Sequence, residues 1–370
     1  MDLQAVVIGA GWAGEGHTKA LQACGVDVVA ICARQQEVVQ QVAARLNVPQ
    51  ASTDWRQTLA DAQPDIVTLA TPAALRLEVV EQAVRQGCHL LSEKPLATTA
   101  AEAERLYALV SQAEVKHAYA ATQRYDPGVA WISELLAQQT IGALRGIDVI
   151  SVLPMFKAFT PYGWVDSLAS GGGVLNNLFP HLFGMLETML NGKLLTAVGG
   201  TQHARTHAPV MPELHDFRKQ FNVTLTPEEA AHGEWRSCDL DTAAWALCQF
   251  KSALSASSPP IQVFIRFDVT APTPAPNNGW YFYGDQGMLI GQGMFALTVS
   301  HLHNGQVEAL PVPQRLITEL PQGGDDVQQK WTALMREFVA DIRNEPHAPY
   351  LTFYDGWRYQ VAIDAIRRGN

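Results

Sequence analysis

Three glycines near the start of the chain constrain its fold more than any other feature. The stretch AVVIGAGWAGEGHTKALQACG places them in the order G-x-G-x-x-G. Residues 5–8 before them form a short β-branched run that is typical of a buried parallel strand. The residues after them have a helical pattern, and Gly25 is placed to end that helix. This order predicts a strand, a phosphate-binding turn and a helix.

Each glycine has a separate physical purpose in such a turn. Gly9 allows the tight turn, Gly11 lets a pyrophosphate approach the backbone, and Gly14 lets helix and strand pack closely. The start of the helix, at Trp12 and Ala13, offers free N–H groups and the positive end of a dipole. We therefore predict that residues 9–14 bind a dinucleotide. The alternative is a glycine-rich turn without a ligand, which the complete context of strand, turn and helix disfavours.

The end of the second strand bears on the choice of cofactor. A carboxylate about 20 residues after the glycines binds the ribose hydroxyls of NAD. This chain has Ala33 and Arg34 in that region, and no acid occurs before Glu37. Because Arg34 can pair with a 2′-phosphate, the sequence favours NADP(H). Arg34 could instead stack on the adenine, so NAD(H) stays open.

Strand and helix patterns alternate through residues 1–124, which predicts a doubly wound parallel sheet. Ligands of such sheets bind beyond the carboxyl ends of the strands. Polar or turn-forming groups occur at three of these ends: Thr71-Pro72, Glu93-Lys94-Pro95 and Gln123-Arg124-Tyr125. We expect Thr71, Pro72, Glu93, Lys94 and Gln123 to contact the cofactor.

Composition limits the remaining classes of function. The chain has 370 residues, 47% of them hydrophobic and 17% charged, which predicts a packed protein of two domains. A net charge of −10 argues against nucleic-acid binding. The five cysteines form no CxxC pair, so neither a disulfide framework nor a metal site is expected. No signal peptide and no apolar run of about 18 residues is visible, so we expect a cytoplasmic protein that does not bind membranes.

At Glu93-Lys94-Pro95 the chain begins to resemble the glucose–fructose oxidoreductase, inositol dehydrogenase and MocA-type family. The motifs that carry the resemblance follow one another over nearly the whole chain: GAGWAGEGH, ATPAAL, SEKPLATT, QRYDP, GGGVLNNLFPH, YFYGDQGMLI and TFYDGWRYQVAIDAIRRG. The resemblance implies an N-terminal Rossmann domain and a C-terminal α+β domain, residues 125–370, with an open, mostly antiparallel sheet. It also implies an NAD(P)-dependent oxidoreductase of sugars, polyols or related small molecules.

The resemblance assigns roles to individual residues. Lys94 takes the position of the lysine that contacts the substrate hydroxyl near the nicotinamide, and His181 takes that of the histidine on the glycine-led helix. A partly desolvated lysine can exchange a proton near neutral pH. The family helix carries an Asp four residues before the histidine, but this chain has Asn177 there, and Phe179 replaces a glycine. Asn can orient a hydroxyl but cannot accept a proton. We therefore expect Lys94 and His181 to act in catalysis, with Asn177 positioning the substrate.

The second domain adds further expectations. Gln123, Arg124 and Trp164 are candidate substrate contacts, Trp164 as an aromatic wall for a sugar ring or as ordinary packing. An open sheet needs cover, and the resemblance implies a homodimer or homotetramer formed through it. Residues 203–237, which hold four histidines, are expected to be a surface insertion rather than a metal site. The final helix, 355–368, is expected to pack back on the first domain.

The change at Asn177 keeps two other functions open. The chain could be a catalytically silent NADP-binding sensor or regulatory protein, but the intact Glu93-Lys94-Pro95 motif favours an enzyme. It could also reduce an imine or a conjugated bond, for which an Asp base is unnecessary.

Overall fold

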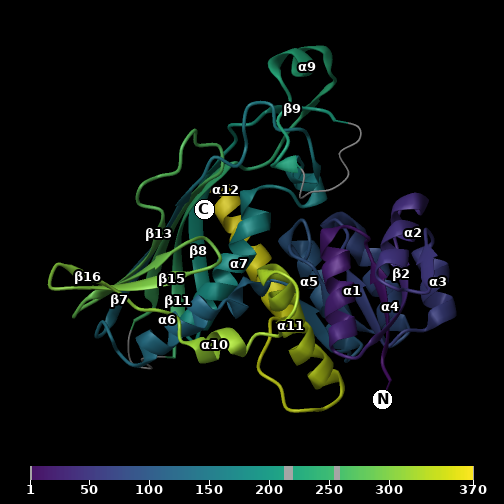
Figure 1. The fold of residues 1–370 in the computed structure, drawn as a ribbon, viewed down its shortest axis with the longest axis horizontal. Coiled ribbons are helices and arrows are strands. Elements are labelled where there is room, and N and C mark those ends of the chain that lie inside the picture. Colours follow the sequence, from purple (N-terminus) through teal and green to yellow (C-terminus); the bar gives the residue numbers. More distant parts are fainter. Residues whose placement is uncertain (1, 212–219, 254–258, 370) are drawn as a thin grey trace.

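A computed structural model describes residues 2–211, 220–253 and 259–369, and shows two large sheets joined by helices (Figure 1). The first sheet has six strands in the order β3-β2-β1-β4-β5-β6, and every strand pair in it is parallel. Its strands are β1 (Gln4–Ile8), β2 (Asp27–Cys32), β3 (Gln50–Ser52), β4 (Ile66–Leu69), β5 (His89–Ser92) and β6 (His117–Tyr119). The helices between them are α1 (Trp12–Ala23), α2 (Gln36–Arg45), α3 (Trp55–Ala62), α4 (Arg76–Arg85) and α5 (Ala100–Gln112). The predicted doubly wound sheet is confirmed.

The order of these strands locates the ligand crevice. The chain runs outward from β1 to β3 in one direction and from β4 to β6 in the other, so the order reverses between β1 and β4. At such a reversal, the loops that follow the two strands diverge and leave a crevice at the carboxyl edge. Residues 9–14 follow β1, and Thr71-Pro72 follows β4. Both loops therefore border this crevice.

The second sheet has eight strands in the order β16-β15-β14-β13-β7-β12-β11-β8. All its neighbouring strands are antiparallel except β7 and β12, which are parallel. The strands are β7 (Leu144–Val152), β8 (Gly192–Gln202), β11 (Ala243–Ser252), β12 (Ile261–Asp268), β13 (Gly279–Gly284), β14 (Met288–Gln292), β15 (Thr298–His303) and β16 (Gln306–Ala309). The expected open, mostly antiparallel sheet is confirmed, and β13 and β14 form an antiparallel hairpin around Gly284-Asp285.

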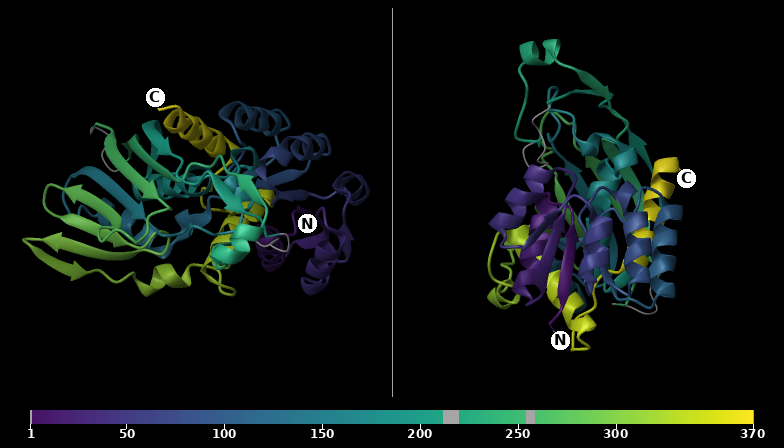
Figure 2. Two further views of the ribbon diagram at one scale, coloured as in Figure 1. Left: turned by 90° about the horizontal axis from the view of Figure 1, so that it is seen from above. Right: turned by 90° about the vertical axis from the view of Figure 1, so that its right-hand side faces the viewer.

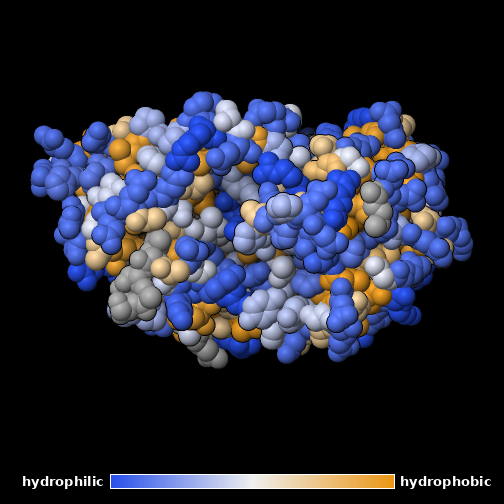
Figure 3. All heavy atoms as spheres, turned by 90° about the horizontal axis from the view of Figure 1, so that it is seen from below, coloured by the Kyte–Doolittle hydropathy of each residue, from blue (hydrophilic) through white to orange (hydrophobic). Residues whose placement is uncertain are grey.

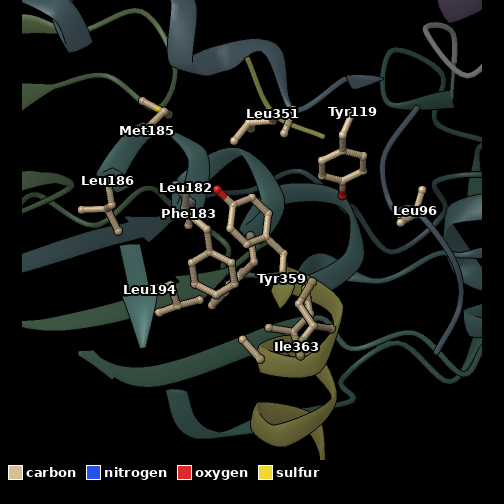
Figure 4. Close-up of a cluster of buried hydrophobic side chains, with 14 of the residues drawn as sticks. Leu96, Tyr119, Leu182, Phe183, Met185, Leu186, Leu194, Leu351, Tyr359 and Ile363 are labelled. Carbon is tan, nitrogen blue, oxygen red and sulfur yellow. The ribbon is translucent and has the colours of Figure 1, made fainter. Parts of the chain in front are cut away.

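One face of the second sheet is covered by three helices: α6 (Pro127–Ala137), α7 (Val174–Met189) and α12 (Phe353–Arg368). Figure 1 shows α7 and α12 between this sheet and the first domain. In the core, Phe183 of α7, Tyr359 and Ile363 of α12 and Leu194 of β8 pack together (Figure 4). The same cluster contains Tyr119 of β6. A single apolar core therefore joins the two domains.

The other face of the second sheet is exposed, and it is partly apolar. Along β11, the buried Ala244, Ala246 and Cys248 alternate with exposed Trp245 and Leu247, as the two-residue period of a strand requires. By contrast, the side of the molecule in Figure 3 is mainly hydrophilic, with apolar residues in scattered groups.

A helix from near the end of the chain completes the first domain. Helix α11 (Asp326–Ile342) packs against α1, and its residues Trp331, Leu334 and Phe338 are buried with residues of β1 and β2. Packing is so close that a Cβ atom on Gly16 would lie 2.2 Å from the Trp331 ring. Helix α12 packs against α5 and β6 as well as against the second sheet. Thus the strands of the first sheet all precede residue 124 and those of the second sheet all follow it. The helices do not obey this division, because α11 and α12 come from the end of the chain and pack on the first domain.

The described residues of the segment 203–237, which are 203–211 and 220–237, project from the body of the molecule (Figures 1 and 2). They contain β9 (His207–Pro209), β10 (Trp235–Ser237) and α9 (Pro227–His232), and β9 pairs with β10. Their base is fixed because Arg205 Nε donates to Asp166 Oδ1 over 2.8 Å and Gln220 Nε2 donates to Asp166 Oδ2 over 3.0 Å. His215, one of the four histidines noted above, lies outside the described residues.

Three features of the described residues bear on the classes of site. They contain no group of three or more His, Cys, Asp or Glu side chains that could hold a metal ion. None of the helices in the described part of the chain has both the length and the apolarity that crossing a membrane requires. All five cysteines are free thiols.

Candidate active site

The glycine loop after β1 has the geometry that the sequence predicts. Gly9 has a φ of +121°, and a Cβ on it would lie 2.5 Å from the Ala70 carbonyl oxygen. A Cβ on Gly14 would lie 1.8 Å from the Gly9 carbonyl oxygen. A larger residue at either position would push the turn, the helix and β4 apart. The two glycines are therefore required by packing, with or without a ligand.

The space around Gly11 fits a dinucleotide. A Cβ at Gly11 would meet no atom within 4 Å, so the backbone there faces open space. Gly11 is also the N-cap of α1, and no side chain caps this helix. The N–H groups at the start of α1, those of Trp12, Ala13 and Gly14, lack helical acceptors and can bind phosphate oxygens. The hydroxyl of Thr71, on the loop after β4, is buried and has no hydrogen-bond partner among the described residues.

Arg34 lies where the second strand ends. It follows Ala33, its side chain is exposed, and it has no hydrogen bond or ion pair with any described residue. The described residues thus leave this guanidinium available at the position where the ribose of a bound dinucleotide is expected.

The Glu93 carboxylate is held from three directions. Its Oε1 accepts hydrogen bonds from Trp331 Nε1 of α11 (2.9 Å) and pairs with His17 Nε2 of α1 (3.2 Å), and Oε2 accepts from the Lys94 backbone N–H (3.1 Å). Burial alone would raise the pKa of Glu93, but the hydrogen bond and charge of His17, with the charge of Lys94, lower it to about 2. Glu93 is therefore a fixed anion that orients the loop, and it is not available as a base at neutral pH.

Lys94 and Asn177 form the central contact between the two domains. Lys94 Nζ donates to Asn177 Oδ1 over 3.1 Å, and Asn177 Nδ2 donates to the Gly173 carbonyl oxygen over 2.8 Å. Because both ends of the amide are engaged, its oxygen must face the lysine. Burial and the charge of Arg76 lower the pKa of Lys94, against the opposite effect of Glu93. The peptide bond between Lys94 and Pro95 is cis.

His181 lies one helical turn after Asn177 and is only 8% exposed. Its Nδ1 atom has no hydrogen-bond partner, and the Phe295 ring packs against it edge to face at 5.3 Å. Burial, together with the charge of Lys94, lowers the pKa of His181 to about 3. The imidazole is therefore neutral at physiological pH and can both donate and accept a hydrogen bond.

Lys330 fixes the remaining wall of the site. Its fully buried ammonium donates to Gln123 Oε1 (2.9 Å) and to the Phe295 carbonyl oxygen (3.2 Å), and forms ion pairs with Asp126 and Asp326. Its charge also acts on His181, which places the two side chains in the same region. Neither Lys330 nor Phe295 was identified from the sequence, because no motif marks them and each is more than 100 residues from His181.

Two other predicted residues lie differently. The Arg124 guanidinium lies over the Tyr125 ring, and its charge acts on Tyr125 and Tyr359, whereas neither Lys94 nor His181 is affected by it. Trp164 is half-buried in a short 3₁₀ helix, η3 (Trp164–Asp166), beside the anchored base of the insertion. The structure thus brings together Lys94, Asn177 and His181, and it does not show Arg124 among them.

The start of α7 is positioned by a buried acid that the sequence analysis missed. Asp241 Oδ2 accepts from the Leu175 backbone N–H (2.7 Å), and Asp241 Oδ1 accepts from Arg367 (3.0 Å). The lead-in is tight: a Cβ on Gly172 would lie 2.3 Å from the Val165 carbonyl oxygen. These contacts fix where Asn177 and His181 enter the crevice. Phe179, in contrast, is fully buried against Phe183 and Phe267.

The depressed pKa of His181 predicts a measurable effect on stability. Below about pH 6.5 the unfolded chain protonates this histidine, whereas the folded chain does not until about pH 3. Its contribution to the free energy of unfolding is therefore present above pH 6.5 and is lost as the pH falls toward 3. We expect His181→Gln to reduce the slope of this free energy between pH 6 and 4 by up to about 1.4 kcal/mol per pH unit.

Urea unfolding at several pH values measures that slope. His232→Gln, on the exposed end of α9, is the matched control and should leave the slope unchanged. Equal slopes in the wild type and in His181→Gln would contradict a neutral, buried imidazole.

Comparisons with known proteins agree with this fold and loop chemistry. The family model described as "Oxidoreductase family, NAD-binding Rossmann fold" matches residues 3–120. Levoglucosan dehydrogenase of Pseudarthrobacter phenanthrenivorans is 27% identical over 201 residues, which are 51% of this chain and 51% of that protein. D-xylose 1-dehydrogenase (NADP(+)) 2 of Haloferax volcanii is 30% identical over 161 residues, 42% of this chain and 48% of that protein. The matches thus span about half the length of these curated relatives.

Likeness to solved structures extends further along the chain. A structure of levoglucosan dehydrogenase in complex with NADH and levoglucosan aligns with a TM-score of 0.76, over 100% of this chain and 97% of that one. At 19% identity this likeness shows the shared fold alone. The resemblance found in the sequence motifs is confirmed over the N-terminal domain: residues 3–120 match the glucose–fructose oxidoreductase, inositol dehydrogenase and MocA-type family of oxidoreductases with an NAD-binding Rossmann fold.

Proposed function

We propose that the protein is an NAD(P)-dependent oxidoreductase that transfers a hydride between the nicotinamide and a carbon of a sugar, polyol or related small molecule. The observation that carries this proposal is the cluster of Lys94, Asn177 and neutral His181 at the carboxyl edge of the parallel sheet. The names of the relatives support it, because levoglucosan dehydrogenase and D-xylose 1-dehydrogenase both refer to oxidation of a carbohydrate.

The proton chemistry follows from Lys94. The nicotinamide cofactor supplies the acceptor or donor of the hydride. Oxidising an alcohol also requires a base for the hydroxyl proton. The pKa of Lys94 is lowered, mainly by burial, which favours the neutral amine that can accept this proton. In the opposite direction the charged Lys94 donates a proton to the carbonyl oxygen. Asn177, fixed by Gly173, holds Nζ in one position, so less conformational freedom is lost on reaching the reactive geometry.

Asn177 changes the balance of charge relative to an aspartate. A carboxylate at this position would stabilise the Lys94 ammonium and raise the pKa of Lys94, whereas the amide does not. The neutral His181 then binds the substrate hydroxyl by a hydrogen bond, and it is not a counter-ion for the lysine. Lys94 is therefore the group that exchanges the proton, and His181 orients the oxygen.

A screen for turnover tests this proposal. The purified protein is offered sugars, polyols and their keto forms with both nicotinamide cofactors. For a substrate that turns over, we expect Lys94→Ala to lower kcat by about a hundredfold or more, since proton transfer is lost, with cofactor binding retained. Lys251→Ala, at an exposed position on β11, is the control. Undiminished turnover by Lys94→Ala would refute the mechanism.

One observation favours a second candidate, a sensor that binds the cofactor without turning over a substrate. Asn177 lacks the acid of the family pattern, and a protein that only senses the cofactor does not need a proton acceptor there. Firm cofactor binding together with no turnover across the whole screen would favour the sensor. Turnover of imines or conjugated carbonyls alone would instead favour a reductase of non-sugar substrates.

We further propose that the cofactor is NADP(H). The exposed Arg34 has no partner among the described residues and lies at the end of β2, where a 2′-phosphate would be bound. NADH is the cofactor bound in one structural relative, whereas NADP(+) appears in the name of another relative. Relatives therefore differ, and the preference depends on this chain's own residues.

Cofactor titration measures that preference. We expect NADPH to bind more tightly than NADH, and Arg34→Ala to weaken NADPH binding about tenfold or more, as expected for loss of a charged hydrogen bond. Binding of NADH should change little. Arg368→Ala, at the exposed end of α12, is the control. If the wild type binds both cofactors equally, the assignment to Arg34 is wrong.

We also propose that the protein forms a homodimer or homotetramer through the second sheet. Val198 on β8, Leu247 on β11 and Phe264 on β12 are direct cross-strand neighbours, so they form one apolar row on the exposed face. Trp245, 50% exposed, extends it. A contiguous apolar surface rimmed by polar residues is typical of an interface, and pairing two copies of the same sheet would cover both rows.

The mass in solution tests this pairing. We expect the wild type to sediment as a dimer or tetramer, and Leu247→Glu to sediment as a folded monomer because a charge would be buried in the interface. Val361→Glu, an exposed apolar position on α12, serves as the control. A monomeric wild type, or an unchanged assembly in Leu247→Glu, would contradict the proposal.

A further inference from the structure

Arg76 is a buried cation placed where a cation is unfavourable. It is the first residue of α4, and it is 2% exposed. The N-terminal turn of a helix disfavours positive charge, and burial of an unpaired guanidinium is costly. Arg76 forms no ion pair with any described residue. Burial lowers the pKa of Arg76 only to about 10, so the side chain stays charged at neutral pH.

The partners of Arg76 explain its position. Its guanidinium donates to the carbonyl oxygens of Glu93, Pro95 and Leu96, and also to that of Thr71 over 2.8 Å. The first three belong to the loop that carries Lys94, and Thr71 belongs to the loop after β4. One side chain therefore joins both loops at the edge of the sheet and surrounds Lys94 with backbone contacts on either side.

The same loop contacts the lead-in to α7. A Cβ on Gly171 would lie 3.2 Å from Ala73 Cβ and 3.3 Å from Pro95 Cγ. Movement of the loop away from Arg76 would thus change the distance from Lys94 to Asn177 as well. Arg76 thus holds the loop on which the Lys94–Asn177 contact depends, without a hydrogen bond of its own to either side chain.

The charge of Arg76 acts on Lys94 in addition. The charged and titratable groups that face Lys94 are Glu93 from its own loop, Arg76 from α4 and His181 from α7. Tyr119 of β6 faces Arg76, and burial raises the pKa of that phenol, so it is neutral. The Glu93 anion is already bound by His17, Trp331 and the Lys94 backbone. The guanidinium is therefore the positive charge that disfavours the ammonium form of Lys94.

We propose that Arg76 is a positioning residue for Lys94: its guanidinium holds the Glu93–Leu96 loop against the Thr71 turn, and its charge promotes release of the Lys94 proton. This role rests on the proposed function only in so far as Lys94 exchanges a proton with a substrate. The effect on the ammonium itself is measurable without any turnover.

Competitive labelling of amines with acetic anhydride across a range of pH tests the charge directly. Only the neutral amine reacts, so mass spectrometry of the Lys94 peptide gives its titration curve, with exposed Lys251 as the internal reference. In the neutral variants Arg76→Gln and Arg76→Met, we expect the Lys94 midpoint to move to higher pH, with labelling at pH 8 slowed about threefold or more. In Arg76→Lys, which keeps the charge, the midpoint should stay near that of the wild type.

Thermal unfolding identifies which variants are folded, and the use of two neutral variants guards against the loss of one. An unchanged Lys94 midpoint in a folded neutral variant overturns the proposal. So does a midpoint in folded Arg76→Lys that moves to clearly higher pH than in the wild type, and this outcome can be measured even if neither neutral variant folds. Arg85→Gln, on the exposed end of α4, should leave the curve unchanged.

Once a substrate is known, kinetics provide a second test. The acidic limb of kcat/KM should move to higher pH in Arg76→Gln together with the labelling midpoint, whereas Arg76→Lys should lower kcat without moving the limb. A labelling shift with no turnover by any variant would keep the role of Arg76 and reject the oxidoreductase. Turnover that depends on Lys94, with no labelling shift, would keep the oxidoreductase and reject the role of Arg76.

Discussion

The buried carboxylate of Glu93 is the interaction on which the rest of the site depends. It binds an imidazole from α1, an indole from α11 and a backbone N–H of its own loop. An anion in an apolar interior is stable only when such donors surround it. The three donors lie on α1, on α11 and in the loop that carries Lys94. The Glu93 carboxylate therefore fixes these three elements relative to one another.

Positive charge predominates in the remainder of the site. Lys94, Arg76 and Lys330 lie around a neutral asparagine and a neutral histidine, while the acids near them already have partners. Replacement of an aspartate by Asn177 therefore has effects beyond the substrate contact, because it removes the negative charge that would stabilise the Lys94 ammonium. Relative to the family pattern that its motifs resemble, the chain has the lysine and the histidine, and Asn177 changes the electrostatics between them.

How far the sequence could predict this site depended on how local each part was. The glycine loop, the Glu93-Lys94-Pro95 motif and the pair of Asn177 and His181 are each contained in a short stretch whose spacing has a direct geometric meaning. Trp331, Lys330, Asp241 and Arg76 were missed because isolated residues on apolar or polar helix patterns carry no such signal. Arg124 shows the converse: its place beside Gln123 suggested a substrate contact, but its side chain lies over Tyr125.

The sequence by itself determined the alternation of strands and helices and the glycine turn after the first strand, because these follow from hydrophobic period and glycine geometry. The lysine and the histidine at the sheet edge were indicated by the resemblance of their motifs to those of a known family. Only the tertiary structure decided which charges meet there. Electrostatic effects depend on distance and burial, and the partners of Glu93, Lys94 and His181 come from helices separated by up to 238 residues. The distances in space between these partners are set by packing of the whole core.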